Sequence, residues 1–316
     1  MALDPLIADF LAKLPPVGGP AASLDALRTA GEVQLRLLHG PLASIADVRT
    51  HSILSSDGHS IRIRAYTPVT PNSVPLPAIV YAHGGGWFRC SLELYDNPCR
   101  ALAHATGCVV LSVDYRLAPE NKFPVPLHDY YTALCWAASH ADELGIDRTR
   151  LVAGGDSSGA NLAAAATLCA RDDTRGPAIA HQLLLYPPLD SAMSSTSYRE
   201  FATGYFLTRS TMEFCWSAYL HVKADGDSPW ASPLRAASLA NLPSATILVC
   251  EYDPLRDEGE AYARRLGEAG VATECHRLDG MVHACIHMLG VTPGARRLFE
   301  LAGSSLKRSL NLTSQP

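Results

Sequence analysis

The feature that most constrains this chain is a Gly-x-Ser-x-Gly pattern between a strand-like and a helix-like segment. Apolar residues 151–153 precede Gly155-Asp156-Ser157-Ser158-Gly159, and small residues follow over 160–166. In such a turn the central serine takes a strained backbone conformation, and a Cβ on either flanking glycine would collide across the turn. The first N–H groups of the following helix point at the same spot, where they stabilise a negative charge. The pattern predicts a nucleophile at Ser157, with an ordinary glycine-rich turn as the alternative.

Strand-like and helix-like segments alternate along most of the chain. We expect strands at 78–82, 108–113, 149–154, 182–186, 245–250 and 273–278. We expect helices at 93–106, 127–144, 158–171, 255–269 and 294–308. This alternation is typical of an α/β fold, with a mostly parallel sheet covered by helices on both faces. Asp57-Gly58 between the segments 45–54 and 60–67 predicts a hairpin that adds antiparallel strands at one edge.

Two parts of the chain lie outside this alternation. Helical patterns at 1–14 and 23–38 precede any strand, and an aromatic-rich segment at 190–235, with one expected helix at 209–221, interrupts the later part. Ligands of open α/β sheets bind at the carboxyl ends of the strands. We therefore predict N-terminal cap helices in 1–44 and a catalytic domain over 45–316 with a cap insertion at about 190–235. For residues 1–44, an additional packing layer is an equally good interpretation.

Composition restricts the class of protein. The chain has 316 residues, 47% of them hydrophobic and 18% charged, which indicates a globular protein with a sizeable core. A net charge of −5 gives no reason to expect nucleic acid or an anionic membrane as partner. The nine cysteines are scattered singly without a Cys-x-x-Cys pair, which favours reduced thiols in a cytoplasmic protein. We expect no secretory signal and no membrane span, because the first residues lack a basic region and no apolar run approaches about 18 residues.

A serine hydroxyl becomes a good nucleophile only when a base takes its proton and a third group orients that base. Asp253 follows the expected strand 245–250, and His283 follows the expected strand 273–278. Residues at the carboxyl ends of parallel strands can converge, so Ser157, Asp253 and His283 fit the order nucleophile, acid, base. Taken singly, Asp253 could be a helix cap before Pro254 and His283 a surface histidine. The other candidates are Asp257 and Glu258 for the acid and His276 and His287 for the base.

An acyl-transfer site also needs N–H donors for the oxyanion. Ser158 follows the nucleophile directly, and His83-Gly84-Gly85-Gly86 follows the strand 78–82. We predict the N–H groups of Gly84, Gly85 and Ser158 as donors, because glycines let the backbone approach a substrate. A phosphate loop would need a following Lys-Ser or Lys-Thr, which is absent, and no His or Cys spacing indicates a metal site.

Five ordered motifs carry a family resemblance. They are His83-Gly84-Gly85-Gly86-Trp87, the stretch 114–120 (Asp-Tyr-Arg-Leu-Ala-Pro-Glu), Gly155-Asp156-Ser157-Ser158-Gly159, the stretch 253–258 (Asp-Pro-Leu-Arg-Asp-Glu) and Gly280-Met281-Val282-His283. Together they resemble the esterases of the hormone-sensitive-lipase group in the α/β-hydrolase fold, over roughly residues 45–305. The resemblance implies an eight-stranded, mostly parallel sheet with a helical cap, and the triad and donors named above. It also implies hydrolysis of carboxylic esters without cofactor, and a possible homodimer through the edge strand 273–278. Ser158 stands where relatives commonly have alanine.

The cap composition bears on the substrate. We expect a compact apolar pocket for acyl groups of up to about eight carbons, since longer chains would have to displace packed side chains. Its expected lining comprises Trp87, Tyr186, Tyr205, Phe206 and Trp216. The alternative is that these aromatics are ordinary core. Two other functions stay open, a non-catalytic small-molecule receptor on the same fold and a lactonase or amidase with the same triad.

Overall fold

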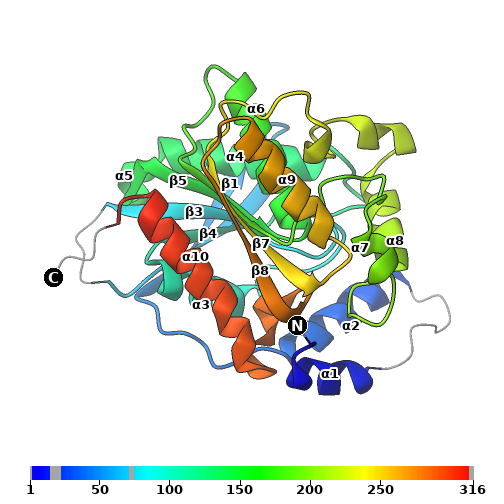
Figure 1. Ribbon diagram of the computed structural model, residues 1–316. Helices are drawn as coiled ribbons and strands as arrows, with labels where there is room; N and C mark the ends of the chain where they lie inside the picture. The colour runs from blue at the N-terminus through cyan, green and yellow to red at the C-terminus, as the bar shows by residue number, and fades with distance from the viewer. Residues whose placement is uncertain (1, 15–22, 71–74, 313–316) are drawn as a thin grey trace.

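A computed structural model of the chain describes residues 2–14, 23–70 and 75–312. These residues form one eight-stranded sheet in the order β1-β2-β4-β3-β5-β6-β7-β8 (Figure 1). The strands are β1 Asp47–Leu54, β2 Ser60–Thr67, β3 Leu76–Ala82, β4 Val109–Val113, β5 Ile146–Asp156, β6 His181–Leu185, β7 Ser244–Tyr252 and β8 Thr273–Val282. From β4 to β8 all neighbouring strands are parallel, whereas β2 pairs antiparallel with both β1 and β4. The predicted α/β-hydrolase fold with its mostly parallel sheet and edge hairpin is confirmed.

Helices cover both faces of this sheet. They are α1 Pro5–Ala12, α2 Leu24–Arg36, α3 Asp96–Thr106, α4 Val125–Ser139, α5 Ala141–Leu144, α6 Ser158–Asp172, α7 Ser197–Glu200, α8 Arg209–Tyr219, α9 Arg256–Glu268 and α10 Arg296–Ser309. Short 3-10 helices are η1 Lys223–Asp227, η2 Pro233–Arg235, η3 Cys285–Gly290 and η4 Pro293–Ala295. In Figure 1, α3 and α10 lie on one face of the sheet, and α4, α6 and α9 lie on the other. None of the helices in the described ranges is long and apolar enough to cross a membrane.

The core has two halves because successive side chains of a buried strand point to opposite faces. In β3, Val80 packs in the half beneath α4, α6 and α9, while Ile79 and Tyr81 pack in the half beneath α3 and α10. All seven residues of β3 are buried. This central strand is therefore fixed from both sides, and the loop at its carboxyl end starts from a rigid position.

The elements differ from the predicted ranges in ways that matter for the site. The helix expected at 127–144 divides at His140 into α4 and α5. At the other end of the chain, β8 runs four residues beyond the expected strand, to Val282. It does so because its pairing with β7 resumes after a register shift, where Tyr252 lies opposite Val282. The extended strand carries the chain directly to His283.

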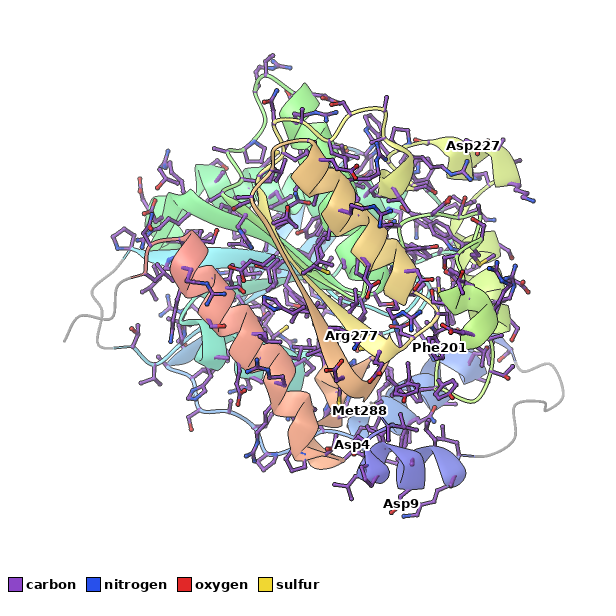
Figure 2. All side chains as sticks on the ribbon, viewed as in Figure 1. Asp4, Asp9, Phe201, Asp227, Arg277 and Met288 are labelled. Carbon is purple, nitrogen blue, oxygen red and sulfur yellow. The ribbon has the colours of Figure 1, made fainter. Side chains whose placement is uncertain are left out.

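The N-terminal helices attach to the carboxyl end of the sheet. The backbone N–H of Asp4 donates to the carbonyl of Gly280 at 3.1 Å, and Asp4 accepts a hydrogen bond from the Thr292 hydroxyl at 2.9 Å. Figure 2 labels Asp4 at this edge, with Met288 nearby. Farther along, the ring centroids of Phe10 and Phe206 lie 5.8 Å apart. Helix α1 thus contacts the segment 190–235, while residues 1 and 15–22 of the predicted N-terminal unit lie outside the described residues.

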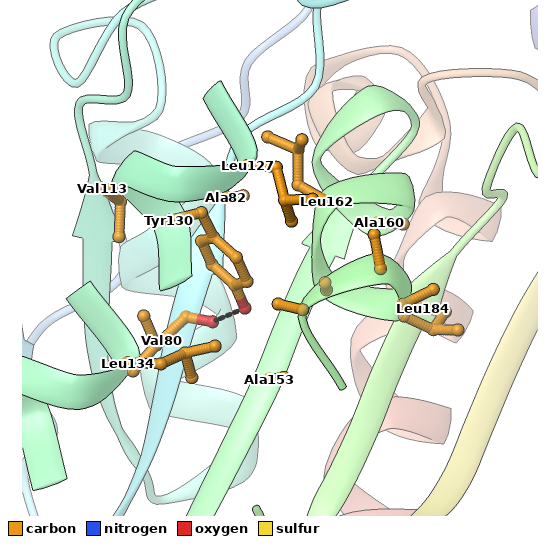
Figure 3. Close-up of a cluster of buried hydrophobic side chains, with 14 of the residues drawn as sticks. Val80, Ala82, Val113, Leu127, Tyr130, Leu134, Ala153, Ala160, Leu162 and Leu184 are labelled. Atoms are coloured by element: carbon orange, nitrogen blue, oxygen red, sulfur yellow. Dashed lines mark hydrogen bonds between the residues drawn. The ribbon is translucent and has the colours of Figure 1, made fainter. Parts of the chain in front are cut away.

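A buried tyrosine links the helix layer to the centre of the sheet. Tyr130 of α4 donates from its hydroxyl to the Val80 carbonyl at 2.8 Å (Figure 3). The same hydroxyl accepts from the Gly154 N–H at 3.0 Å. Its side chain is fully buried. Removing the hydroxyl would leave a buried N–H and a buried carbonyl without this partner.

We therefore expect Tyr130→Phe to lower the free energy of unfolding by about 1–3 kcal/mol, the usual cost of an unsatisfied buried polar group. Chemical denaturation with circular dichroism measures this change. Tyr131→Phe is the matched control, because the hydroxyl of Tyr131 bonds Asp173 near the surface, and it should change stability by less than about 0.5 kcal/mol. Equal effects of the two variants would contradict the inference.

Candidate active site

Ser157 lies in the sharp turn between β5 and α6. Its backbone has φ 51° and ψ −126°, a region that non-glycine residues seldom adopt. Its N–H donates to the carbonyl of Leu185 on β6 at 2.8 Å. A Cβ on Gly159 would overlap the Ala82 carbonyl oxygen, and one on Gly155 would overlap the backbone of Gly159. The two glycines of the pattern are thus required by the close passage of α6 over the end of β3.

Three side chains from separate strand ends form one hydrogen-bonded row. Ser157 Oγ lies 2.9 Å from His283 Nε2, and His283 Nδ1 lies 2.7 Å from Asp253 Oδ2. Ser157 follows β5, Asp253 follows β7, and His283 follows β8, so β6 stands between the first two in the sheet. Asp253 is fully buried, whereas Ser157 and His283 keep 8% and 5% of their surface exposed. A serine bonded to a histidine that a buried carboxylate orients is the geometry of nucleophilic acyl transfer.

The other acids that the sequence left open point elsewhere. Asp257 accepts from the Ser197 N–H at 2.8 Å, and Glu258 accepts from the Leu189 N–H at 2.7 Å. Both carboxylates thus hold the chain at and after the end of β6. Asp253 also accepts from the Leu255 N–H at 2.9 Å. It therefore makes a local hydrogen bond of the kind expected for a capping residue, in addition to its contact with His283.

The alternative bases have other hydrogen-bond partners than Ser157 and Asp253. His276 pairs with Glu274 on β8 at 3.0 Å. His287 lies 2.9 Å from His39, measured between ring nitrogens, and its pKa is well below the usual range because the ring is buried and faces His39 and Arg89. His287 nevertheless lines the same cavity as Ser157.

Asp156, the residue before the serine, organises the loop after β3. One of its carboxylate oxygens accepts from the Tyr81 hydroxyl and from the Gly84 N–H, each at 2.9 Å, and the other accepts from the Tyr95 hydroxyl at 2.9 Å. Burial raises the pKa of Asp156 to about 6 although these hydrogen bonds oppose the rise. The structure contradicts Gly84 as an oxyanion donor, because its N–H donates to Asp156 and to the Tyr95 oxygen.

The remaining N–H groups of this loop are better placed for an oxyanion. Gly85 and Gly86 line the cavity beside Ser157. Their N–H groups and that of Ser158 make no hydrogen bond with any described residue. Gly85 has φ 121° and Gly86 has φ 62°, conformations that favour glycine. The sequence singled out the loop and Ser158 but missed Gly86, and the pairing of Asp156 with Gly84 gave no signal in the sequence.

The row borders a cavity of about 350 Å³. Its walls come from the end of α1, α2, the loop after β3, the segment 190–235 and the loop after β8. The lining that sequence analysis missed comprises Leu14, Gln34, Leu35, Arg89, Cys90, Tyr95, Leu207, Thr211, Met212, Cys215 and Ala284. The sequence predicted a helix at 23–38 but did not indicate which of its residues face the cavity.

Of the five aromatics expected to line a pocket, Phe206 lines this cavity. Trp87 instead stacks on Tyr219 with ring centroids 4.4 Å apart, and Trp216 packs against Trp87 at 4.5 Å. The other two, Tyr186 and Tyr205, contact His283 and Tyr252 respectively. The core interpretation therefore holds for Trp87, Tyr186 and Trp216, which are buried, whereas Tyr205 is half-buried and packs against the edge of the core.

Fold and site define the class of this protein. The sequence profile of the family described as "alpha/beta hydrolase fold" matches residues 79–287, and the chain belongs to this family. An arylesterase of Saccharolobus solfataricus is 38% identical over 84% of this chain and 85% of that protein. An ethyl acetate hydrolase of Pseudomonas putida is 34% identical over 91% and 93%.

Solved structures agree with these relatives. A thermostable esterase from Pseudomonas putida superposes with a TM-score of 0.91 at 34% identity, over 98% of both chains. The hyperthermophilic esterase of the archaeon Pyrobaculum calidifontis gives 0.91 at 36% identity, over 99% of this chain and 100% of that one. The resemblance to the α/β-hydrolase esterases is confirmed.

The burial of Glu258 predicts how the free energy of unfolding depends on pH. Burial raises the pKa of this carboxyl from 4.5 to about 8, so the folded chain keeps a proton that the unfolded chain releases within this window. The resulting stability is fully present below pH 4.5 and is lost as pH rises towards 8, by up to about 1.4 kcal/mol per pH unit.

Glu258→Gln cannot ionise, so this fall should be missing from its free energy of unfolding measured by urea titration between pH 5 and 8. Glu260→Gln makes the same exchange at an exposed position on α9 and should keep the wild-type slope. A Glu258→Gln slope equal to the wild-type slope would refute the assignment.

Proposed function

We propose that this chain is a serine carboxylesterase that hydrolyses short- to medium-chain esters through an acyl-enzyme. The observation that carries the proposal is the row Ser157, His283 and Asp253 at the wall of the cavity, with hydrogen bonds of 2.9 and 2.7 Å. Relatives named as esterases, at 34–38% identity over most of the chain, support the same reaction class.

In the first half of the reaction, Ser157 Oγ attacks the ester carbonyl while His283 Nε2 takes its proton. The Nδ1–H of His283 donates to Asp253, which keeps the ring in the correct tautomer and stabilises the imidazolium. The carbonyl oxygen becomes an oxyanion, which accepts from the N–H groups of Gly85, Gly86 and Ser158. When the C–O bond breaks, the alcohol leaves with the proton from His283, and the acyl group stays on Ser157.

The second half repeats these steps with water as nucleophile. His283 takes a proton from the water, whose oxygen attacks the acyl carbon. The second oxyanion collapses, the acid leaves, and Ser157 Oγ regains its proton from His283. The strained φ of 51° at Ser157 supports this role, because it holds the hydroxyl above the turn before substrate binds.

The other functions on this fold are less well supported. A non-catalytic receptor needs no base beside the serine, whereas here the histidine and serine atoms lie 2.9 Å apart. A lactonase or amidase would use the same groups. No feature of the described cavity favours a ring or an amine leaving group over an alcohol, so ester hydrolysis remains the better proposal.

The cavity supports a limit on substrate size. Its volume of about 350 Å³ is at the lower end of the range of about 300–1,000 Å³ usual for ligand sites. We assign the N-terminal helices and the segment 190–235 to a cap, because Gln34 and Leu35 of α2 and Met212 of α8 border the cavity. Beyond the volume they enclose, each further methylene has to displace packed side chains. Pairing of two copies and a cytoplasmic location stay predictions from the sequence.

Variants of the row test the mechanism. We expect Ser157→Ala and His283→Ala to lower kcat by about 10³-fold or more, and Asp253→Asn by somewhat less, as losses from such triads do. Steady-state hydrolysis of p-nitrophenyl butyrate measures these changes. Asp257→Asn is the matched control on the neighbouring acid and should stay within a few-fold of wild type. A crippled Asp257→Asn with a nearly active Asp253→Asn would show that the acid is misassigned.

Chain length tests the size limit. With p-nitrophenyl esters of two to sixteen carbons, kcat/KM should rise from acetate to butyrate or hexanoate and fall beyond about eight carbons. Each buried methylene adds about 0.8 kcal/mol to binding until the cavity is full, and overpacking then costs about 1–3 kcal/mol. A maximum at sixteen carbons, or a flat profile, would contradict the proposed size limit.

A further inference from the structure

An arginine that has no acidic partner among the described residues lines the candidate active-site cavity. Arg89 borders the same cavity as Ser157 and His283. Its Nε is buried without a hydrogen-bond partner, and its guanidinium makes no hydrogen bond or ion pair with any described residue. Most other arginines of the described chain do form such pairs, as Arg116 does with Asp129 at 2.7 Å. The guanidinium of Arg89 therefore has N–H donors that are free to bind a substrate in this cavity.

Among the residues that the structure describes, packing contacts hold Arg89 in place and no acidic side chain pairs with it. Its backbone N–H donates to the Gly85 carbonyl at 3.2 Å, so its main chain belongs to the loop that carries the proposed oxyanion donors. Its guanidinium carbon lies 5.5 Å from the ring centroid of Phe88. On the other side, a Cβ added to Gly31 of α2 would come within 2.7 Å of Arg89 Nη1. The side chain lies between the loop and α2, close to the proposed catalytic groups.

None of the neighbouring acids among the described residues forms an ion pair with Arg89. Asp156 shares the cavity wall, but its oxygens already accept from Tyr81, Tyr95 and Gly84. Glu32, the residue after Gly31, makes no ion pair with Arg89 in the described structure. His287, which also lines the cavity, is a neutral ring at pH 7 because burial lowers its pKa. The cavity wall therefore carries two charges at pH 7, the carboxylate of Asp156, whose oxygens are already hydrogen-bonded, and the guanidinium of Arg89, which has no hydrogen-bond partner among the described residues.

We propose that Arg89 binds a carboxylate group of the substrate, so that the preferred esters are anionic. They would be half-esters of dicarboxylic acids or acyl esters of hydroxy acids. The inference rests on the proposed ester hydrolysis and specifies its substrate class. A guanidinium is permanently charged and presents a planar fork of donors that matches a carboxylate. A monoanion neutralises the single charge of Arg89, whereas a phosphate dianion would leave one charge without a partner in a site of low dielectric.

Two pairs of esters with one ester bond each test this proposal. Monoethyl succinate and ethyl succinamate differ by a carboxylate or amide on the acyl side. 3-Acetoxypropanoate and 3-acetoxypropanamide differ in the same way on the alcohol side. For each pair, the ratio of kcat/KM for the anionic ester to that for the neutral ester is measured with the full chain at pH 7.

Arg89→Gln should lower this ratio about 10- to 100-fold in at least one pair, the range expected for losing a charge-assisted hydrogen bond. The loss should fall mainly on KM, because the carboxylate is bound equally in the ground state and the transition state. Arg89→Lys keeps the charge but not the fork, and should recover part of the ratio. Arg297→Gln makes the same exchange at an exposed arginine on α10 and should leave all four rates unchanged.

The pair in which the ratio falls identifies the side of the ester that carries the carboxylate. Unchanged ratios in both pairs would overturn the inference and leave the proposed function standing. If none of the four esters is hydrolysed, the proposed function fails instead.

A measurement on the wild-type chain does not depend on how the variants fold. Succinate should inhibit ethyl butyrate hydrolysis competitively and at least tenfold more strongly than succinamide. Rising NaCl concentration should weaken this inhibition. Equal inhibition by succinate and succinamide would contradict a carboxylate site.

Discussion

The structure depends on the contact between the start of α6 and the end of β3. Gly159 lies so close to the Ala82 carbonyl that no larger residue fits between them. This contact closes the turn tightly enough to force Ser157 to a φ of 51°, and it brings the loop after β3 beside the serine. The proposed nucleophile and the proposed oxyanion donors thus share one local cause, which is the absence of side chains where two backbones meet.

The buried carboxylate of Asp156 fixes the loop after β3. Asp156 joins Tyr81 of β3, Tyr95 before α3 and Gly84 through hydrogen bonds of 2.9 Å. Because burying a carboxylate costs free energy, these donors are needed to keep it in place. In return they orient the loop so that Gly85 and Gly86 face the cavity. Asp156 acts on the geometry of the site without belonging to the row of Ser157, His283 and Asp253.

Charge is distributed unevenly around the site. On the core side of α9, Glu258 is buried, and its raised pKa, about 8, keeps it protonated over much of the neutral range. In the wall of the candidate active-site cavity, Arg89 keeps a permanent charge without a partner among the described residues. A buried polar group without a partner is costly for folding, so such groups often serve ligand binding. The unpartnered guanidinium of Arg89 is the physical basis of the proposed preference for anionic substrates.

The sequence by itself determined the fold and the proposed row of three residues. Alternating strands and helices specify a parallel sheet, and residues that directly follow parallel strands meet at one edge, so Ser157, Asp253 and His283 could be named from their positions. Tertiary structure alone decided which N–H of the glycine loop is free, because the Gly84 N–H is taken by Asp156, 72 residues away. It also decided that Trp87 and Trp216 pack on each other, and that Arg89 lies against Gly31. These outcomes depend on contacts between distant elements, which periodicity along one strand or helix does not encode.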